Sequence, residues 1–131
     1  MKIRVISSQK ILLKSDDVRS VSLPGSEGQM QILPSHENLV STIEIGKLEV
    51  QIGQSEEKRS FVVNGGFVVV REDDVIVLVD DAAVPDEVVK EEIEKAIENA
   101  QDKLKTVTDP KELIQLEKQL RYEKFKRQQV S

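Results

Sequence analysis

The side chains that could take part in chemistry are few in this chain, and they are scattered. Its only histidine is His36 and it has no cysteine, so no second imidazole or thiolate can complete a metal or nucleophilic site. Two acidic pairs, Asp73-Asp74 and Asp80-Asp81, could act as paired carboxylates or bind a cation. Both adjoin the ends of apolar runs, where aspartate is a common turn residue. We therefore interpret both pairs as solvated turns.

Motifs for phosphate binding and nucleophilic catalysis are also missing. The sequence has no glycine-rich GxxxxGK[ST] segment and no nucleophile elbow. Its net charge of −5 argues against general nucleic-acid binding, because phosphate contacts need a basic face. The sequence therefore predicts a protein that is not an enzyme, with no cofactor, no metal and no nucleic-acid partner.

In the first part of the chain, apolar and polar residues alternate with a period of two. Residues 47–52 alternate without a break, which is typical of a strand with one face in water. Three continuous apolar runs indicate strands lying between other elements: residues 61–63, 67–70 and 75–79. We expect tight turns at residues 64–66 and 72–74. Several short strands at this spacing predict an N-terminal antiparallel β-sandwich over residues 1–84.

After residue 81 glycine disappears and the apolar residues take helical spacing. One face of a first helix carries Val89, Ile93, Ile97, Ala100 and Leu104. A second helix is predicted to begin at Pro110, with Asp109 as its N-cap and Glu112 completing a capping box. Its apolar stripe consists of Leu113, Leu116 and Leu120, with Phe125 near the end. The short connection predicts an antiparallel two-helix hairpin over residues 85–131.

The segment of residues 23–36 combines two glycines, two prolines and His36, and we interpret it as a surface loop held in one shape. The order Gly25-Ser26-Glu27-Gly28, then Ile32-Leu33-Pro34 and His36, resembles the N-terminal domain of the epsilon subunit of F-type ATP synthases. Residues 65–67 and 75–82 stand where that family has a Gly-Gly-aromatic turn and its last strand. The family continues into a C-terminal helical hairpin, so the resemblance covers the whole chain.

The resemblance implies a non-catalytic central-stalk subunit of a proton-translocating ATP synthase, which couples ion flow to ATP synthesis. The implied partners are the gamma subunit, the membrane rotor ring and the catalytic-head beta subunits. The implied interface candidates are Glu27, Gln29, Met30, Gln31 and His36. The helical hairpin is implied to inhibit ATP hydrolysis through a basic row: Lys118, Arg121, Lys124 and Arg127. Gln31 and Ser35 each replace a glycine of the usual family pattern, so we expect a stiffer segment here.

Some bacterial epsilon subunits bind regulatory ATP through an Ile/Leu-Asp-x-x-Arg-Ala motif at the start of the first C-terminal helix. Here Val89 and Glu92 stand in place of its aspartate and arginine. A carboxylate in place of the arginine repels phosphate, so ATP binding is not expected.

The chain has no apolar run of about 18 residues and no charged-then-apolar signal at its N-terminus, so we expect no membrane insertion. The expected location is peripheral, on the cytoplasmic or stromal face of an energy-coupling membrane. The main alternative is an independent β-sandwich ligand-binding module with a helical dimerisation tail. Such modules usually stack exposed aromatic rings on their ligands, and aromatic residues make up only 3% of this chain. A small enzyme is the second alternative, although no motif supports it.

Overall fold

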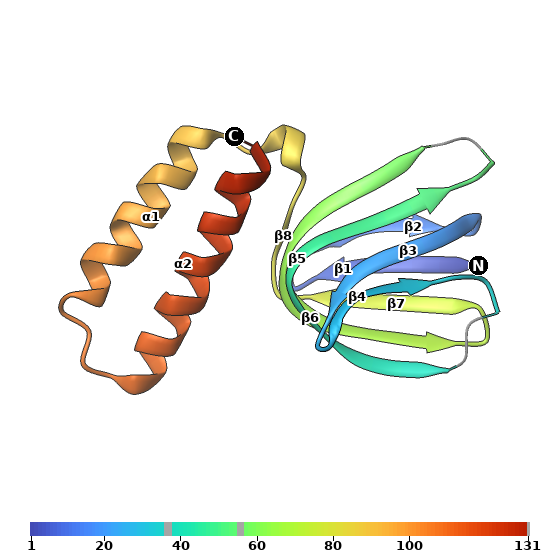
Figure 1. Ribbon diagram of the computed structural model, residues 1–131, viewed down its shortest axis with the longest axis horizontal. Coiled ribbons are helices and arrows are strands. Elements are labelled where there is room, and N and C mark those ends of the chain that lie inside the picture. The colour runs from blue at the N-terminus through green and yellow to red at the C-terminus, as the bar shows by residue number, and fades with distance from the viewer. Residues whose placement is uncertain (36–37, 55–56, 131) are drawn as a thin grey trace. The chain divides into compact units, whose positions relative to one another are not determined.

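The computed structural model describes residues 1–35, 38–54 and 57–130. The chain divides into two compact units, Met1–Ala83 and Val84–Ser131. Strands make up the first unit, and helices dominate the second (Figure 1).

The first unit is built on β1 (Lys2–Ser7), β2 (Ile11–Ser15), β3 (Val18–Gly25), β4 (Gly28–Ile32), β5 (Leu39–Ile52), β6 (Lys58–Arg71), β7 (Asp74–Val79) and β8 (Ala82–Ala83). These strands form one hydrogen-bonded sheet in the order β2-β1-β7-β6-β5-β3-β4, with β8 paired to β6. Figure 1 shows the long strands β5 and β6 curving strongly, so that the sheet folds over on itself. A sheet folded in this way encloses a core between its layers, as in the predicted β-sandwich.

Valine, isoleucine and leucine fill the core of the β unit. In several strands alternate residues point inward, for example Ile3 and Val5 in β1 and Val75, Val77 and Val79 in β7, all at most 5% exposed. The alternation predicted for residues 47–52 is confirmed, because Leu48 and Val50 are buried while Lys47 is exposed. Burial of these β-branched and aliphatic side chains is the main source of the unit's stability.

One strand pair departs from the predicted antiparallel arrangement. β1 and β7 run parallel, with Ile3 opposite Val75 and Ser7 opposite Val79, whereas the other strand pairs are antiparallel. The N-terminal strand thereby completes a sheet whose other strands follow one another mostly through hairpins.

The prediction of a tight turn at residues 64–66 is wrong. β6 continues through these residues, and Ile45 still pairs with Asn64 while Ile43 pairs with Gly66. Gly65 and Gly66 have φ angles of 81° and 148°, which residues with a Cβ rarely adopt. Before the two glycines three successive residues of β6 are buried, Phe61, Val62 and Val63, whereas after them burial alternates, with Val68 and Val70 buried and Phe67 exposed. The two glycines therefore bend a continuous strand and do not end it.

The loop expected at residues 23–36 is also largely a hairpin. β3 extends to Gly25, a turn follows at Ser26 and Glu27, and β4 begins at Gly28, which pairs with Gly25. Gly28 has a φ of 119°, and glycine at such a position is a signal for a short hairpin turn. Pro24 is accommodated inside β3, opposite Gln29. Among the described residues of this segment, the turn at Ser26 and Glu27 and the three residues Leu33 to Ser35 lie outside the strands.

The second unit contains η1 (Pro85–Glu87), α1 (Lys90–Leu104) and α2 (Pro110–Val130). The two α-helices pack as a hairpin (Figure 1). Ile93, Ile97 and Ala100 of α1 and Leu116 of α2 are buried, in agreement with the predicted apolar stripes. Pro110 begins α2, and the Asp109 Oδ1 atom accepts a hydrogen bond from the Lys111 N–H at 3.0 Å, so the predicted N-cap is confirmed.

The predicted stripes are incomplete at their edges. Val89 lies just before α1 and is 47% exposed, and Leu113 is 38% exposed. Tyr122, which the stripe of α2 did not include, is only 2% exposed. Tyrosine has a largely apolar ring with one polar hydroxyl group, so it can be buried beside a narrow apolar stripe.

Candidate docking site

The predicted interface residues of the β unit lie on the β3–β4 hairpin. Glu27 is exposed in its turn, Gln29 and Gln31 are exposed on β4, and Met30 is half-buried. β4 is the last strand of the sheet order, so it is an edge strand. The Gln29 Nε2 atom donates to the Ser22 Oγ atom at 2.7 Å, which holds this side chain against β3. His36 lies outside the described residues.

The connection that follows β4 is tied to the turn between β6 and β7. The Ser35 N–H donates to the Asp73 Oδ1 atom, and the Glu72 N–H donates to the Asn38 Oδ1 atom at 3.3 Å. Sequence reasoning missed both contacts, since the partners are more than 30 residues apart. Asp73 and Asn38 are residue types whose side chains often accept hydrogen bonds from backbone N–H groups in turns. The sequence does not show which backbone N–H group each side chain accepts from.

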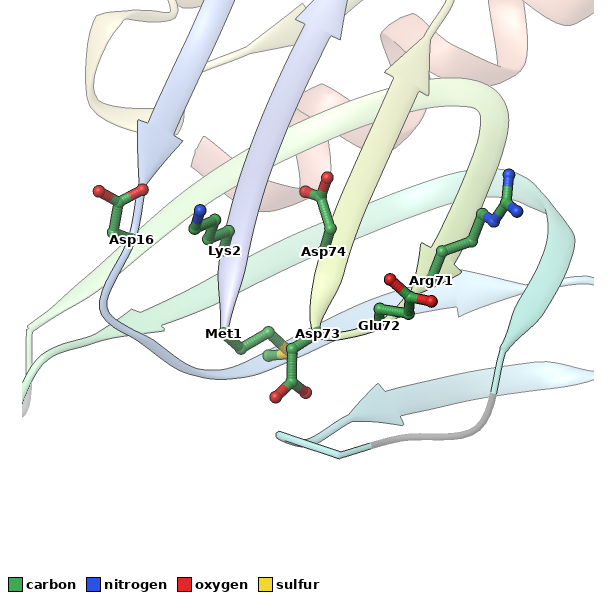
Figure 2. Close-up of a pocket in the computed structure, with 7 residues that line it drawn as sticks. All are labelled: Met1, Lys2, Asp16, Arg71, Glu72, Asp73 and Asp74. Carbon is green, nitrogen blue, oxygen red and sulfur yellow. The ribbon is translucent and has the colours of Figure 1, made fainter.

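The acidic pair Asp73-Asp74 does not form a pair of facing carboxylates. Figure 2 shows the two side chains pointing in opposite directions. Asp73 accepts from Ser35, whereas the Asp74 Oδ2 atom lies 3.3 Å from the Arg4 Nη2 atom. The predicted turn is present at Glu72 and Asp73, whose φ angles are 50° and 65°. The second pair lies in the short connection between β7 and β8, where the Asp81 Oδ1 atom accepts from the Ala82 N–H.

An open depression of about 460 Å³ lies at this end of the β unit (Figure 2). Its lining carries charges of both signs: Met1, Lys2, Asp16, Arg71, Glu72, Asp73 and Asp74. Among the described residues, no group of three or more histidine, cysteine, aspartate or glutamate side chains could hold a metal ion. The depression is a polar surface feature rather than an enclosed apolar pocket of the kind that binds small molecules.

The basic row of α2 is only partly exposed. Arg121 and Lys124 are exposed, while Lys118 and Arg127 are half-buried. The Arg127 Nη1 atom lies 3.5 Å from the Glu94 Oε2 atom of α1. One member of the predicted row therefore already has an acidic neighbour within the hairpin.

A second polar cluster of α2 was not predicted. The Lys126 Nζ atom lies 2.9 Å from the Glu123 Oε1 atom and 4.6 Å from the centre of the Tyr122 ring. Both charged side chains are at most 15% exposed. Their spacing of three and four residues was the available signal, because residues so spaced are neighbours on a helix surface.

The start of α1 is acidic. Val89 occupies the N-cap position without a side-chain hydrogen bond, and Glu91 and Glu92 lie in the first turn. Carboxylates are favourable at a helix N-terminus, and they occupy the place where a phosphate would otherwise be attracted.

In the part of the chain that the structure describes, no helix is long and apolar enough to cross a membrane.

These features define a class of protein. A strand-built unit presents an edge hairpin with exposed polar side chains, and a separate helical hairpin presents cations. Such surfaces suit docking to other macromolecules rather than chemistry on a bound substrate.

Residues 1–85 match the family model of the ATP synthase delta/epsilon chain β-sandwich domain. The ATP synthase epsilon chain of Leptospira borgpetersenii is 40% identical over 97 residues, which cover 74% of each chain. A chain in the Euglena gracilis mitochondrial ATP synthase (OSCP/F1/c-ring) superposes with a TM-score of 0.75 at 27% identity, covering 94% of this chain and 76% of that one. A chain in the Tetrahymena thermophila mitochondrial ATP synthase central stalk/c-ring structure has the same fold, with a TM-score of 0.73 at 14% identity and coverage of 100% and 96%.

The chain belongs to the ATP synthase epsilon chain family. It is a rotor-stalk subunit, which has no catalytic activity of its own, and the predicted family, fold class and function class are confirmed.

Proposed function

We propose that this chain joins the rotor shaft of a proton-translocating ATP synthase to its membrane ring, so that torque from ion flow reaches the catalytic head. The proposed partners are the gamma subunit and the rotor ring, bound by the β unit, and the catalytic-head beta subunits, bound by the helical hairpin. The expected location is the cytoplasmic or stromal face of the membrane. The observation that carries this proposal is the family match over residues 1–85, which includes the β3–β4 hairpin.

The construction of the β unit supports a role in transmitting torque. A subunit that transmits torque must not deform, and a close-packed interior resists deformation. The strands of the β unit pair over long stretches. The longest pairing joins β5 to β6 and runs from Leu39 opposite Val70 to Gln51 opposite Lys58. The exposed side chains of Glu27, Gln29 and Gln31 project from this rigid support, which is a favourable arrangement for a docking surface.

The helical hairpin is proposed to act as a brake on ATP hydrolysis. α1 and α2 bury a limited set of side chains, and Arg121 and Lys124 remain exposed on α2. Few buried contacts make an element easy to displace, and exposed cations suit an acidic partner surface. ATP is not proposed as a ligand, because Glu92 occupies the first turn of α1.

Co-purification tests the proposal directly. The tagged full chain is expressed with the other subunits of its own ATP synthase, and the gamma subunit and the rotor ring should copurify with it. Replacing Gln29 and Gln31 by lysine should reduce their recovery, whereas the matched control Gln54→Lys, which lies in the β5–β6 connection, should not. Recovery of the unmodified chain alone, with no stalk or ring subunit, would reject the proposal.

A further inference from the structure

Asn64 and Gly65 form the one Asn-Gly dipeptide of the chain, and they lie where β6 bends. The other two asparagines, Asn38 and Asn99, are followed by leucine and alanine. A backbone nitrogen can attack the carboxamide carbon of the asparagine before it, and a glycine nitrogen does so most readily because no side chain hinders its approach. The sequence therefore makes Asn64 the asparagine most prone to deamidation.

Deamidation at this dipeptide takes place in two balanced steps. The Gly65 nitrogen gives up its proton and bonds to the Asn64 Cγ atom, while the bond from Cγ to the side-chain nitrogen breaks and ammonia leaves with the proton. The product of this step is a cyclic imide. Water then opens the imide at either of its two carbonyl carbons, which gives an aspartate or an isoaspartate, whose backbone runs through the former side chain. Solvent water is the only co-reactant.

The folded strand opposes closure of the imide ring. Asn64 has the extended backbone of β6, and the ring closes only when that backbone leaves the extended conformation. The Asn64 N–H donates to the Asp81 carbonyl oxygen at 2.9 Å. The Asp80 N–H donates to the Gly65 carbonyl oxygen at 3.0 Å, and on the other side of β6 Ile45 pairs with Asn64. The reacting dipeptide is thus held from both sides.

The side of β8 is the one that can open most easily. β8 has only two residues, both half-buried, and it pairs with Val62 and Val63. Short elements with few buried contacts open at a lower free energy than the long strands of a core. Release of β8 and of the connection before it frees the Asn64 N–H and the Gly65 carbonyl together. Reaction at Asn64 therefore depends on this local opening.

The folded bend does not accommodate the products of the reaction. The Asn64 Oδ1 atom is buried and has no hydrogen-bond partner among the described residues. A carboxylate at this position is a buried charge without a donor, which is strongly unfavourable. An isoaspartate lengthens the backbone beside Gly66, which lies against the Leu78 carbonyl oxygen with no room to shift. Both products therefore favour the opened bend.

We propose that Asn64 is a protected deamidation site, at which the folded bend and β8 suppress the reaction and the reaction, once complete, prevents the bend from forming again. The inference goes beyond the proposed function and does not depend on it. A chain that has opened at β8 for long enough is then marked irreversibly at Asn64.

The first test follows the reaction in the full chain. The protein is incubated at mildly alkaline pH, in buffer and in urea above the unfolding midpoint, and peptide mass spectrometry measures conversion of each asparagine to a carboxyl product. In urea Asn64 should react faster than Asn38 and Asn99. In buffer Asn64 should react more slowly than in urea, on the order of tenfold or more. Equal rates of Asn64 conversion in buffer and in urea would show that the fold gives no protection.

Two variants test the route through β8. Ala82→Pro places a proline in β8, which removes an N–H and disfavours pairing with β6, so it should raise the rate at Asn64 in buffer several-fold. Leu13→Ala is the matched control, because it weakens the core at β2, away from β8 in the sheet. If Leu13→Ala speeds the reaction as much as Ala82→Pro, global unfolding and not release of β8 exposes the dipeptide, and the proposed route is wrong.

A last variant tests the effect of the product. Asn64→Asp creates one product directly and should lower the midpoint of thermal unfolding. Asn99→Asp makes the same change on an exposed side chain of α1 and should alter the midpoint little. If Asn64→Asp is as stable as Asn99→Asp, the bend accepts the carboxylate and the reaction does not keep it open.

Discussion

Gly66 lies directly against the backbone of Leu78 on the neighbouring strand. A Cβ atom added at Gly66 would overlap the Leu78 carbonyl oxygen and would stand 2.8 Å from the Cα atom of Val79. These backbone atoms belong to β7, which is paired on both sides, so they cannot move away. The bend in β6 therefore depends on the absence of a side chain at one position.

We expect Gly66→Ala to lower the free energy of unfolding by about 3 kcal/mol, because it adds both a steric overlap and an unfavourable φ. Gly28→Ala is the matched control: its φ is also positive, at 119°, but no atom lies within 4 Å of the added Cβ. The control should cost only about 1 kcal/mol. Urea unfolding measures both values, and equal losses would show that backbone conformation alone makes Gly66 necessary.

Residues 1–84 should fold without the helical hairpin. The fragment keeps β8, which pairs with Val62 and Val63 of β6, and it keeps the Asp81 carbonyl oxygen that accepts from the Asn64 N–H at 2.9 Å. We expect one cooperative unfolding transition and retained gamma binding. A shorter fragment of residues 1–79, which lacks these contacts, should be less stable. An aggregating 1–84 fragment with no cooperative transition would show that the hairpin is part of the core.

ATP should not stabilise the full chain. Glu92 lies in the first turn of α1, where its carboxylate repels phosphate, and Val89 at the N-cap offers no side-chain hydrogen bond. A ligand present at a hundred times its Kd stabilises a protein by about 2.7 kcal/mol, so a micromolar site would raise the Tm clearly at millimolar ATP. We expect no shift in a thermal melt. A shift already at micromolar ATP would contradict this expectation.

The basic row of α2 should inhibit ATP hydrolysis as a set. Each exposed ion pair contributes only a few tenths of a kcal/mol to about 1 kcal/mol, so the inhibition should weaken as salt is raised. Arg127 should contribute least, because it lies beside Glu94 within the hairpin. The test is ATP hydrolysis by the reconstituted complex in which four residues are changed to alanine together: Lys118, Arg121, Lys124 and Arg127.

We expect that quadruple variant to hydrolyse ATP faster than the unmodified complex. A matched control removes the same charge from the first helix and its C-cap: Lys90, Lys95, Lys103 and Lys105 to alanine. The control should leave the rate unchanged. If deletion of the whole hairpin activates hydrolysis but the quadruple variant does not, apolar packing or bulk must inhibit. If deletion changes nothing, the hairpin is not a brake.

The Lys47–Glu49 pair should make a small, pH-dependent contribution to stability. The Lys47 Nζ atom lies 2.9 Å from the Glu49 Oε1 atom, and this hydrogen bond lowers the pKa of Glu49. A lowered pKa stabilises the fold above the unfolded value of about 4.3, and the effect is lost as pH falls through the folded value.

Glu49→Gln should therefore cost a few tenths of a kcal/mol at pH 7 and nothing at pH values below the folded pKa. Glu44→Gln, an exposed change on the same strand, serves as the control. Urea unfolding at pH 7 and at a pH below the folded pKa measures the loss of unfolding free energy in each variant. If Glu49→Gln still lowers the unfolding free energy at the lower pH, packing and not charge is the cause.

Local sequence accounted for the elements whose cause is local. Alternation placed Leu48 and Val50 inside β5, and the Asp109-Pro110 pair marked the start of α2. The same local reasoning was wrong for Gly65 and Gly66. Paired glycines are compatible with a turn or with a bend, and only the neighbouring strand decides between them. It was also wrong for residues 23–36. Pro24 suggested a loop there, but it lies within β3, which pairs with the adjacent strand β4.

The sequence by itself determined the two periodicities, the absence of cysteine chemistry and the family to which the chain belongs. These follow from residue types and from spacing along one segment. The tertiary structure decided the parallel pairing of β1 with β7, the contact of Ser35 with Asp73 and the neighbour of Arg127. Each joins residues that are distant in sequence. Periodicity tells which face of a segment is buried, but it carries no information about the segment that covers it.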